Sequence, residues 1–139
     1  MMDRPVQPWL SFADADLAAA EHNLATGFPH HWVTAFHAQQ AVEKYMKAFL
    51  VAHGDAEFPF THNVRQLRRR LASIDRALAD SMEAADPLTP YATLARYPER
   101  EVGEGVRSAE VSEEAARSAA RVARDVGTRI REKLESYTA

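Results

Sequence analysis

Four polar residues that could bind a ligand recur at helical spacing in one stretch without Gly or Pro: Gln40, Glu43, Lys44 and Lys47. At about 100° per residue, these positions share one side of an α-helix. Two ammonium groups near one another can meet phosphates, and the Gln40 amide can hydrogen-bond a base edge. The alternative is a surface ion pair, since Glu43 precedes Lys47 by four residues, an order that stabilises a helix by only about 0.2–0.5 kcal/mol.

A second candidate, His62, follows a residue type that favours helix starts. Thr61 is predicted to be an N-cap, so that His62 would lie beside the first amides of the next helix and Arg65 one turn later. His62 is interpreted either as a structural or capping residue with one hydrogen bond or as a group that holds a phosphate or transfers a proton.

The third candidates, Arg96 and Tyr97, directly precede Pro98. Proline disfavours a helical conformation of the residue before it, so the pattern predicts a helix stop that directs both side chains at a neighbour. Arg96 then either pairs with Glu43, within the chain or at an interface, or contacts a substrate.

The composition excludes several other kinds of site. The chain has no cysteine, which excludes disulfides, thiolate metal sites and a Cys nucleophile. Its six histidines lack metal-ligand spacing and its glycines form no phosphate-binding loop, so we expect no metal and no cofactor. The sequence also contains two arginine clusters. The first comprises Arg65, Arg68, Arg69 and Arg70, and the second comprises Arg117, Arg121, Arg124 and Arg131. Both are interpreted as solvated helix faces, with RNA contact as the alternative.

The whole chain is predicted to be a single domain over residues 1–139. Its 17 basic and 20 acidic residues create no overall basic field, so RNA is not the expected partner and would have to meet a local patch. The sequence contains no apolar run long enough to cross a membrane, and its first ten residues do not resemble a signal peptide. We therefore expect a cytoplasmic protein with no membrane partner.

Apolar residues recur every three or four positions along most of the chain. This spacing predicts an all-α protein, an up-and-down bundle of four to five helices. The expected elements are a helix over 11–26 capped by Ser11, a long helix over 30–53 ended by Gly54, one or two helices over 61–86 with a possible break at 73–75, a short turn over 91–97, and a terminal helix after Ser112. Alanine-rich stripes predict that the long and terminal helices pack antiparallel.

Apolar side chains interrupt the polar arc of the long helix. Trp32, Phe36 and Leu50 fall among its polar residues, and a fully solvated face would seldom carry those three. We therefore expect that a cleft or a second subunit covers this arc, and that a cleft would bring Gln40, Glu43, Lys44 and Lys47 close to His62 and Arg96.

Three segments in order give the chain a family resemblance: FHAQQAVEKYMKAFL at 36–50, FTHNVRQL at 60–67 and ARYP at 95–98. Together they resemble the HEPN domain family, small helical prokaryotic proteins associated with nucleotidyltransferases. The resemblance implies a helical bundle that is usually a homodimer and is often the companion of a small nucleotidyltransferase in toxin–antitoxin-like pairs. It also implies nucleotide binding or metal-independent RNA cleavage.

The chain departs from the family in the residues that cleave RNA. HEPN ribonucleases resemble one another in an Arg followed, after four to six residues, by a His, and no His of this chain follows an Arg at that spacing. The sequence therefore indicates a non-catalytic module that binds a nucleotide or a partner, with no catalytic residues assigned. The alternatives are an RNA-cleaving toxin that uses His62 and a purely structural adaptor.

Overall fold

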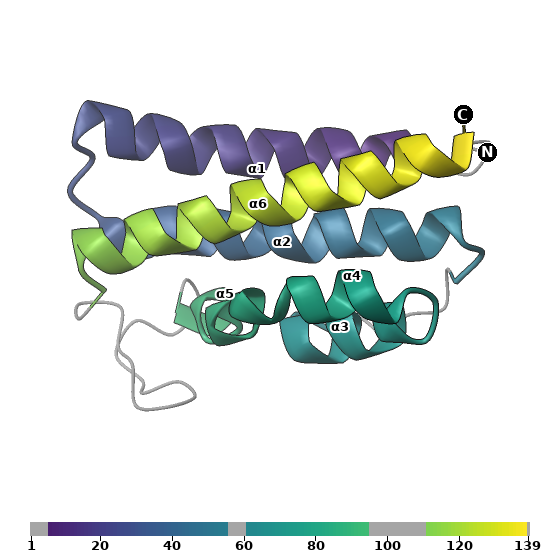
Figure 1. The fold of residues 1–139 in the computed structure, drawn as a ribbon. Coiled ribbons are helices and arrows are strands. Elements are labelled where there is room, and N and C mark those ends of the chain that lie inside the picture. Colours follow the sequence, from purple (N-terminus) through teal and green to yellow (C-terminus); the bar gives the residue numbers. More distant parts are fainter. Residues whose placement is uncertain (1–5, 56–60, 95–110, 139) are drawn as a thin grey trace.

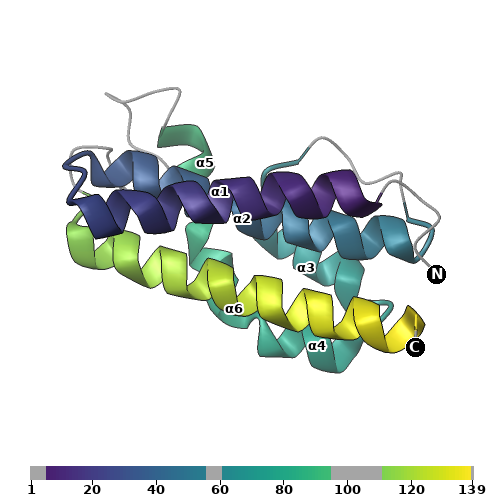
Figure 2. The same ribbon diagram turned by 90° about the horizontal axis from the view of Figure 1, so that it is seen from above.

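Three long helices form the body of the protein in the computed structural model, which describes residues 6–55, 61–94 and 111–138. They are α1 (Val6–Thr26), α2 (His31–Ala52) and α6 (Glu113–Thr138), and they lie side by side (Figures 1 and 2). Shorter elements cover the remaining side of α2 and α6: α3 (Val64–Ala72), α4 (Arg76–Ser81), the 3-10 helix η1 (Glu83–Leu88) and α5 (Tyr91–Leu94). The predicted all-α bundle is confirmed, and the described ranges contain no strand.

The directions of the helices differ from the prediction at one point, because α6 runs parallel to α2 (Figure 1). The two C-terminal ends meet where the rings of His53 and Tyr137 lie 4.7 Å apart between centroids. The connection explains the direction. It passes the end of α6 at the turn between α3 and α4, where Lys133 contacts Asp75 at 3.2 Å, and then returns to the start of α2, where Leu94 packs with Ala35. The expectation of antiparallel packing was therefore wrong.

Two predicted helix starts were also wrong, that of α3 by two residues and that of α1 by more. Helix α1 is already helical at Val6, ahead of Ser11, and tolerates Pro8 because backbone amides in a first turn have no partner within the helix. The cap of α3 is Asn63, whose side chain accepts a hydrogen bond from the Gln66 backbone N–H at 3.1 Å. Thr61 instead accepts one from the Asn63 backbone N–H at 3.0 Å.

Other boundaries agree with the sequence. Ser112 accepts a hydrogen bond from the Ala115 N–H at 3.0 Å, and Gly54 follows α2 with a φ of 83°, a left-handed conformation that suits glycine. The open question over 61–86 resolves into two helices and a 3-10 helix, because Asp75 caps α4 by accepting from the Leu78 N–H at 2.9 Å.

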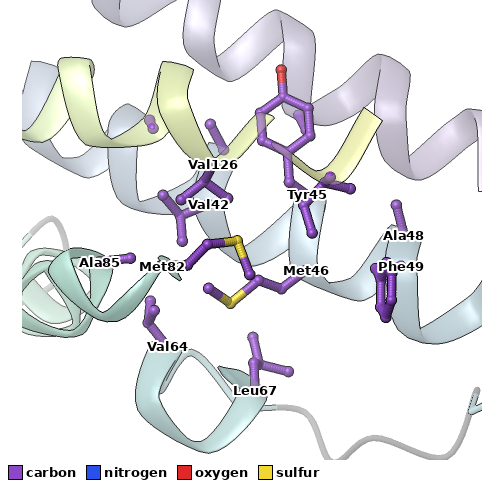
Figure 3. Packing of buried hydrophobic residues seen from close by; sticks show 14 of the residues in the cluster. Val42, Tyr45, Met46, Ala48, Phe49, Val64, Leu67, Met82, Ala85 and Val126 are labelled. Atoms are coloured by element: carbon purple, nitrogen blue, oxygen red, sulfur yellow. The ribbon is translucent and has the colours of Figure 1, made fainter. Parts of the chain in front are cut away.

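The core is centred on α2. Tyr45, Met46 and Phe49 are buried there against apolar side chains of the surrounding elements, including Val64, Leu67, Met82 and Val126 (Figure 3). Leu50 belongs to this core and is fully buried within one chain, whereas Trp32 is only partly buried. The core therefore accounts for Leu50 without a second subunit. Within the described residues, no helix is long and apolar enough to span a bilayer.

Candidate functional site

Glu43 lies at the centre of a hydrogen-bonded cluster where α2 meets the segment before α3. Its carboxylate accepts hydrogen bonds from Lys47 Nζ at 2.6 Å and from the Gln39 and Gln40 amides at 3.2 and 3.3 Å. Glu43 is 3% exposed and Lys47 6%. Because an isolated buried charge is very unfavourable, the two charges depend on each other. Glu43 and Lys47 are therefore not the surface pair that their spacing also allowed.

His62 is attached to this cluster at two points. Its ring Nδ1 lies 3.0 and 3.1 Å from the two carboxylate oxygens of Glu43, and its backbone carbonyl accepts a hydrogen bond from the Gln39 amide at 3.1 Å. Since an ionised carboxylate only accepts hydrogen bonds, Nδ1 must carry a proton. The other ring nitrogen, Nε2, is then the ring atom that can bind a ligand, since the His62 side chain is 44% exposed.

Lys47 has a second neighbour on α1. Its Nζ lies 5.6 Å from the centroid of the Trp9 ring, within the range of a cation–π contact. The ammonium group is thus held between Glu43 and an aromatic face and is buried. In this arrangement Lys47 neutralises the site from within rather than meeting a ligand.

Lys44 belongs to a neighbouring cluster instead. Its Nζ contacts Asp16 of α1 at 2.5 Å, and the other Asp16 oxygen lies 2.9 Å from His37 Nδ1. Burial alone would raise the pKa of the Asp16 carboxyl, but the hydrogen bonds and charges of His37 and Lys44 lower it on balance. The ring of Phe12, itself 63% exposed, lies 5.9 Å from Lys44 Nζ.

Arg65 belongs to a third group, which is centred on Asp86. Its Nε contacts Asp86 of η1 at 3.3 Å, whereas Arg68 binds the same carboxylate with two hydrogen bonds of 2.8 Å. Burial would raise the pKa of the Asp86 carboxyl, and the two arginines lower it on balance. Arg96 and Tyr97, the other predicted site residues, lie outside the described residues.

The predicted site residues thus fall into separate groups. Gln40, Glu43, Lys47 and His62 come together, Lys44 lies in the adjacent Asp16 cluster, and Arg65 pairs with Asp86. Sequence reasoning missed the contributions of three residues that complete these groups: Trp9, Asp16 and Asp86. Each acts on a residue of another element, and local spacing carries no signal for such contacts. Within the described residues, no group of three or more His, Asp or Glu could hold a metal ion.

Two solved structures share this fold. The protein TT1696 from Thermus thermophilus has a TM-score of 0.73 and 24% sequence identity, with 94% of this chain and 98% of that chain covered. ST0689, described as an archaeal HEPN homologue, has a TM-score of 0.68 and 23% identity, with 95% and 98% covered. At these identities the likeness concerns the fold. A search of curated proteins finds no match.

The sequence also matches one protein family over nearly its whole length. The model of the HEPN domain matches residues 6–133, which include every helix that supplies a residue to the Glu43 cluster. The match agrees with the resemblance of the three sequence segments and with the fold of the archaeal homologue. The chain belongs to the HEPN domain family.

Proposed function

We propose that the protein is a non-catalytic HEPN module that binds the phosphate of a nucleotide at His62. The observation that carries this proposal is the double attachment of His62, whose ring and backbone carbonyl both bind buried side chains of α2. A half-exposed ring held in this way is pre-organised, so that binding costs little further side-chain entropy. Protonated at Nε2, the ring would donate a charge-assisted hydrogen bond to a phosphate oxygen.

Neighbouring side chains offer the other contacts that a nucleotide needs. The Gln40 amide adjoins Glu43, and Lys44 follows on the same side of α2 with its side chain partly exposed. The Gln40 amide nitrogen already donates to Gln39 and Glu43, so its oxygen remains to accept a hydrogen bond from a base edge. The Lys44 ammonium, which is paired with Asp16, can also meet a second phosphate oxygen. The buried Glu43–Lys47 pair supports this surface without adding net charge.

A nucleotide panel with two histidine variants tests the proposal. A nucleotide present at 100 times its dissociation constant should stabilise the wild-type protein by about 2.7 kcal/mol, measured as a thermal shift. His62→Gln should remove the shift. His22→Gln is the matched control, because His22 is an exposed histidine of α1 and should keep the shift. A shift that persists unchanged in His62→Gln, or a panel without any shift, would contradict the proposal.

A second candidate function, partner binding, is favoured by Phe12. This ring is 63% exposed beside Lys44, on the same side of the molecule as the Asp16 cluster. The partner would be a second copy of the chain, giving a homodimer, or a nucleotidyltransferase for which the protein serves as a structural adaptor. Sedimentation of Phe12→Ser tests the first case: a wild-type dimer should become a monomer, while nucleotide-induced shifts stay unchanged.

A further inference from the structure

Among the described residues, helix α3 has more arginines than ion-pair partners. Its nine residues include four arginines and no acidic residue. Two of the arginines are paired with carboxylates of other elements: Arg68 with Asp86 at 2.8 Å in two places, and Arg70 with Asp55 at 2.6 and 3.1 Å. These pairs hold η1 and the residues that follow α2 against α3.

The other two arginines form the surplus. Within residues 6–55, 61–94 and 111–138, Arg65 has one ion-pair contact, at 3.3 Å to the Asp86 carboxylate that Arg68 already binds, and its side chain is 60% exposed. Arg69 is exposed, and no acidic side chain of the described ranges pairs with it. One carboxylate thus faces two guanidinium groups, and a further guanidinium faces solvent.

The surplus charges lie on one side of the helix and are unfavourable to it. Residues four apart are neighbours on an α-helix, about 6 Å apart along its axis, and like charges there destabilise it by about 0.2–0.5 kcal/mol. Arg65 also lies in the first turn, where the helix dipole disfavours a cation. His62 precedes Asn63, the cap residue of this turn. A bound polyanion would relieve both effects.

We propose that the edge formed by His62, Arg65 and Arg69 binds a chain of two or more phosphate groups. This inference rests on the proposed function, in which His62 binds the first phosphate, and it specifies the ligand further. In this arrangement the first phosphate contacts His62 and lies near the start of α3, where the Arg65 side chain is 60% exposed. A longer chain continues along α3 and also reaches Arg69, whose charge no described carboxylate neutralises.

Calorimetric titration without divalent cations tests this inference, with inorganic orthophosphate and tripolyphosphate and with adenosine mono- and triphosphate. We expect wild-type protein to bind each three-phosphate ligand at least 10-fold more tightly than its one-phosphate counterpart. Arg69→Gln should remove most of that difference and leave the affinity for one phosphate unchanged. Arg76→Gln, which alters an exposed arginine of α4, is the matched control and should bind like wild type.

The outcomes separate this inference from the proposed function. Equal affinities for adenosine triphosphate and tripolyphosphate would identify the phosphate chain as the recognised group, and a tighter nucleotide would add a contact to the base. Both results support the inference. Equal affinities for one and three phosphates, or equal losses in Arg69→Gln and Arg76→Gln, would overturn it while binding at His62 stands. Absence of binding by every ligand would overturn the proposed function itself.

Discussion

Glu43 is the residue on which the candidate site depends. Its carboxylate accepts hydrogen bonds from four side chains, those of Gln39, Gln40, Lys47 and His62. Such a buried polar network is stable only while all its members are satisfied. Changes at Glu43 therefore affect both the stability of the protein and the orientation of His62.

The first prediction is that Glu43→Gln strongly destabilises the protein. The substitution keeps the shape of the side chain but leaves the Lys47 ammonium buried without a counter-charge, which costs about 3–5 kcal/mol. Urea denaturation measures the loss. Replacing both partners, as in Glu43→Leu with Lys47→Met, should recover much of the stability, because an apolar pair needs no counter-charge. The double variant should still lose nucleotide binding, since His62 Nδ1 then has no acceptor. A stable Glu43→Gln protein would contradict this account.

The burial of Lys47 also decides which substitution can test the site. Because the sequence suggests that Lys47 meets a phosphate, the charge reversal Lys47→Glu would be the obvious test of that contact. In the structure it would place a second carboxylate beside Glu43 inside the protein. We expect that variant to unfold, so His62→Gln is the informative substitution.

The second prediction is that the purified protein does not cleave RNA. A carboxylate-oriented histidine has the parts of a general base, but the Arg that HEPN ribonucleases place before their His is absent from this chain. Incubation with structured and unstructured RNAs measures the activity. Cleavage that is lost in His62→Ala and kept in His37→Ala would establish the toxin alternative instead, because His37 is also oriented by a carboxylate, that of Asp16.

Part of this site was predictable from the sequence. Helical spacing places Glu43 and Lys47 together, because an i, i+4 pair lies on one helix face wherever the helix packs. His62 was proposed from its place near a helix start, although the cap proved to be Asn63. The contacts of Lys47 with Trp9 and of Lys44 with Asp16 depend on how α1 packs against α2. Local patterns do not specify that packing.

At the scale of helices, the close packing of α6 against α2 depends on one glycine. A Cβ at Gly127 would lie 2.8 Å from Cε2 and Cζ of the Tyr45 ring. That ring is buried, and its hydroxyl donates a hydrogen bond to Asp14 at 2.6 Å. Burial and the contact with Asp14 both raise the pKa of Tyr45, so that its hydroxyl remains protonated. The ring therefore has little freedom to move away.

The third prediction concerns Gly127→Ala. Alanine favours a helix over glycine by about 1 kcal/mol, but overpacking a core costs about 1–3 kcal/mol, so we expect a net loss of stability in urea denaturation. In a double-mutant cycle, Tyr45→Leu should reduce the cost of Gly127→Ala, because leucine lacks the ring atoms that the Cβ would meet. The exposed neighbour Thr128→Ala should change stability little. A more stable Gly127→Ala protein would show that Tyr45 moves freely.

Helix content was predictable, whereas helix direction was not. The stretch without Gly or Pro gave α2 nearly its observed length, and Gly54 marked its end, because both features act through local backbone preference. The parallel run of α2 and α6 follows from where the connection between them ends. That depends on the break that Asp75 introduces between α3 and α4.

Across the whole molecule, acidic side chains connect α1 to the rest of the bundle. Helix α1 contains no Lys or Arg. Asp14 pairs with Arg131 and Glu21 pairs with Arg124, both of α6, while Asp16 contacts Lys44 and His37 of α2. The pKa values of all three carboxyls are lowered in the folded protein. Asp16 is the least exposed of the three, so solvent screens its contacts least.

The fourth prediction is that acid destabilises the protein through these carboxylates, with Asp16 as the clearest case. Its folded-state pKa is lowered below the unfolded value of about 3.9, so its contribution to stability is fully present above that value and is lost as the pH falls through the folded-state pKa. Asp16→Asn removes the charge and should cost about 1.5–3 kcal/mol at pH 7. Urea denaturation from pH 7 to pH 2.5 should show the two proteins converging as wild-type Asp16 becomes protonated. A difference that stays constant with pH would mean that Asp16 acts through packing rather than through its charge.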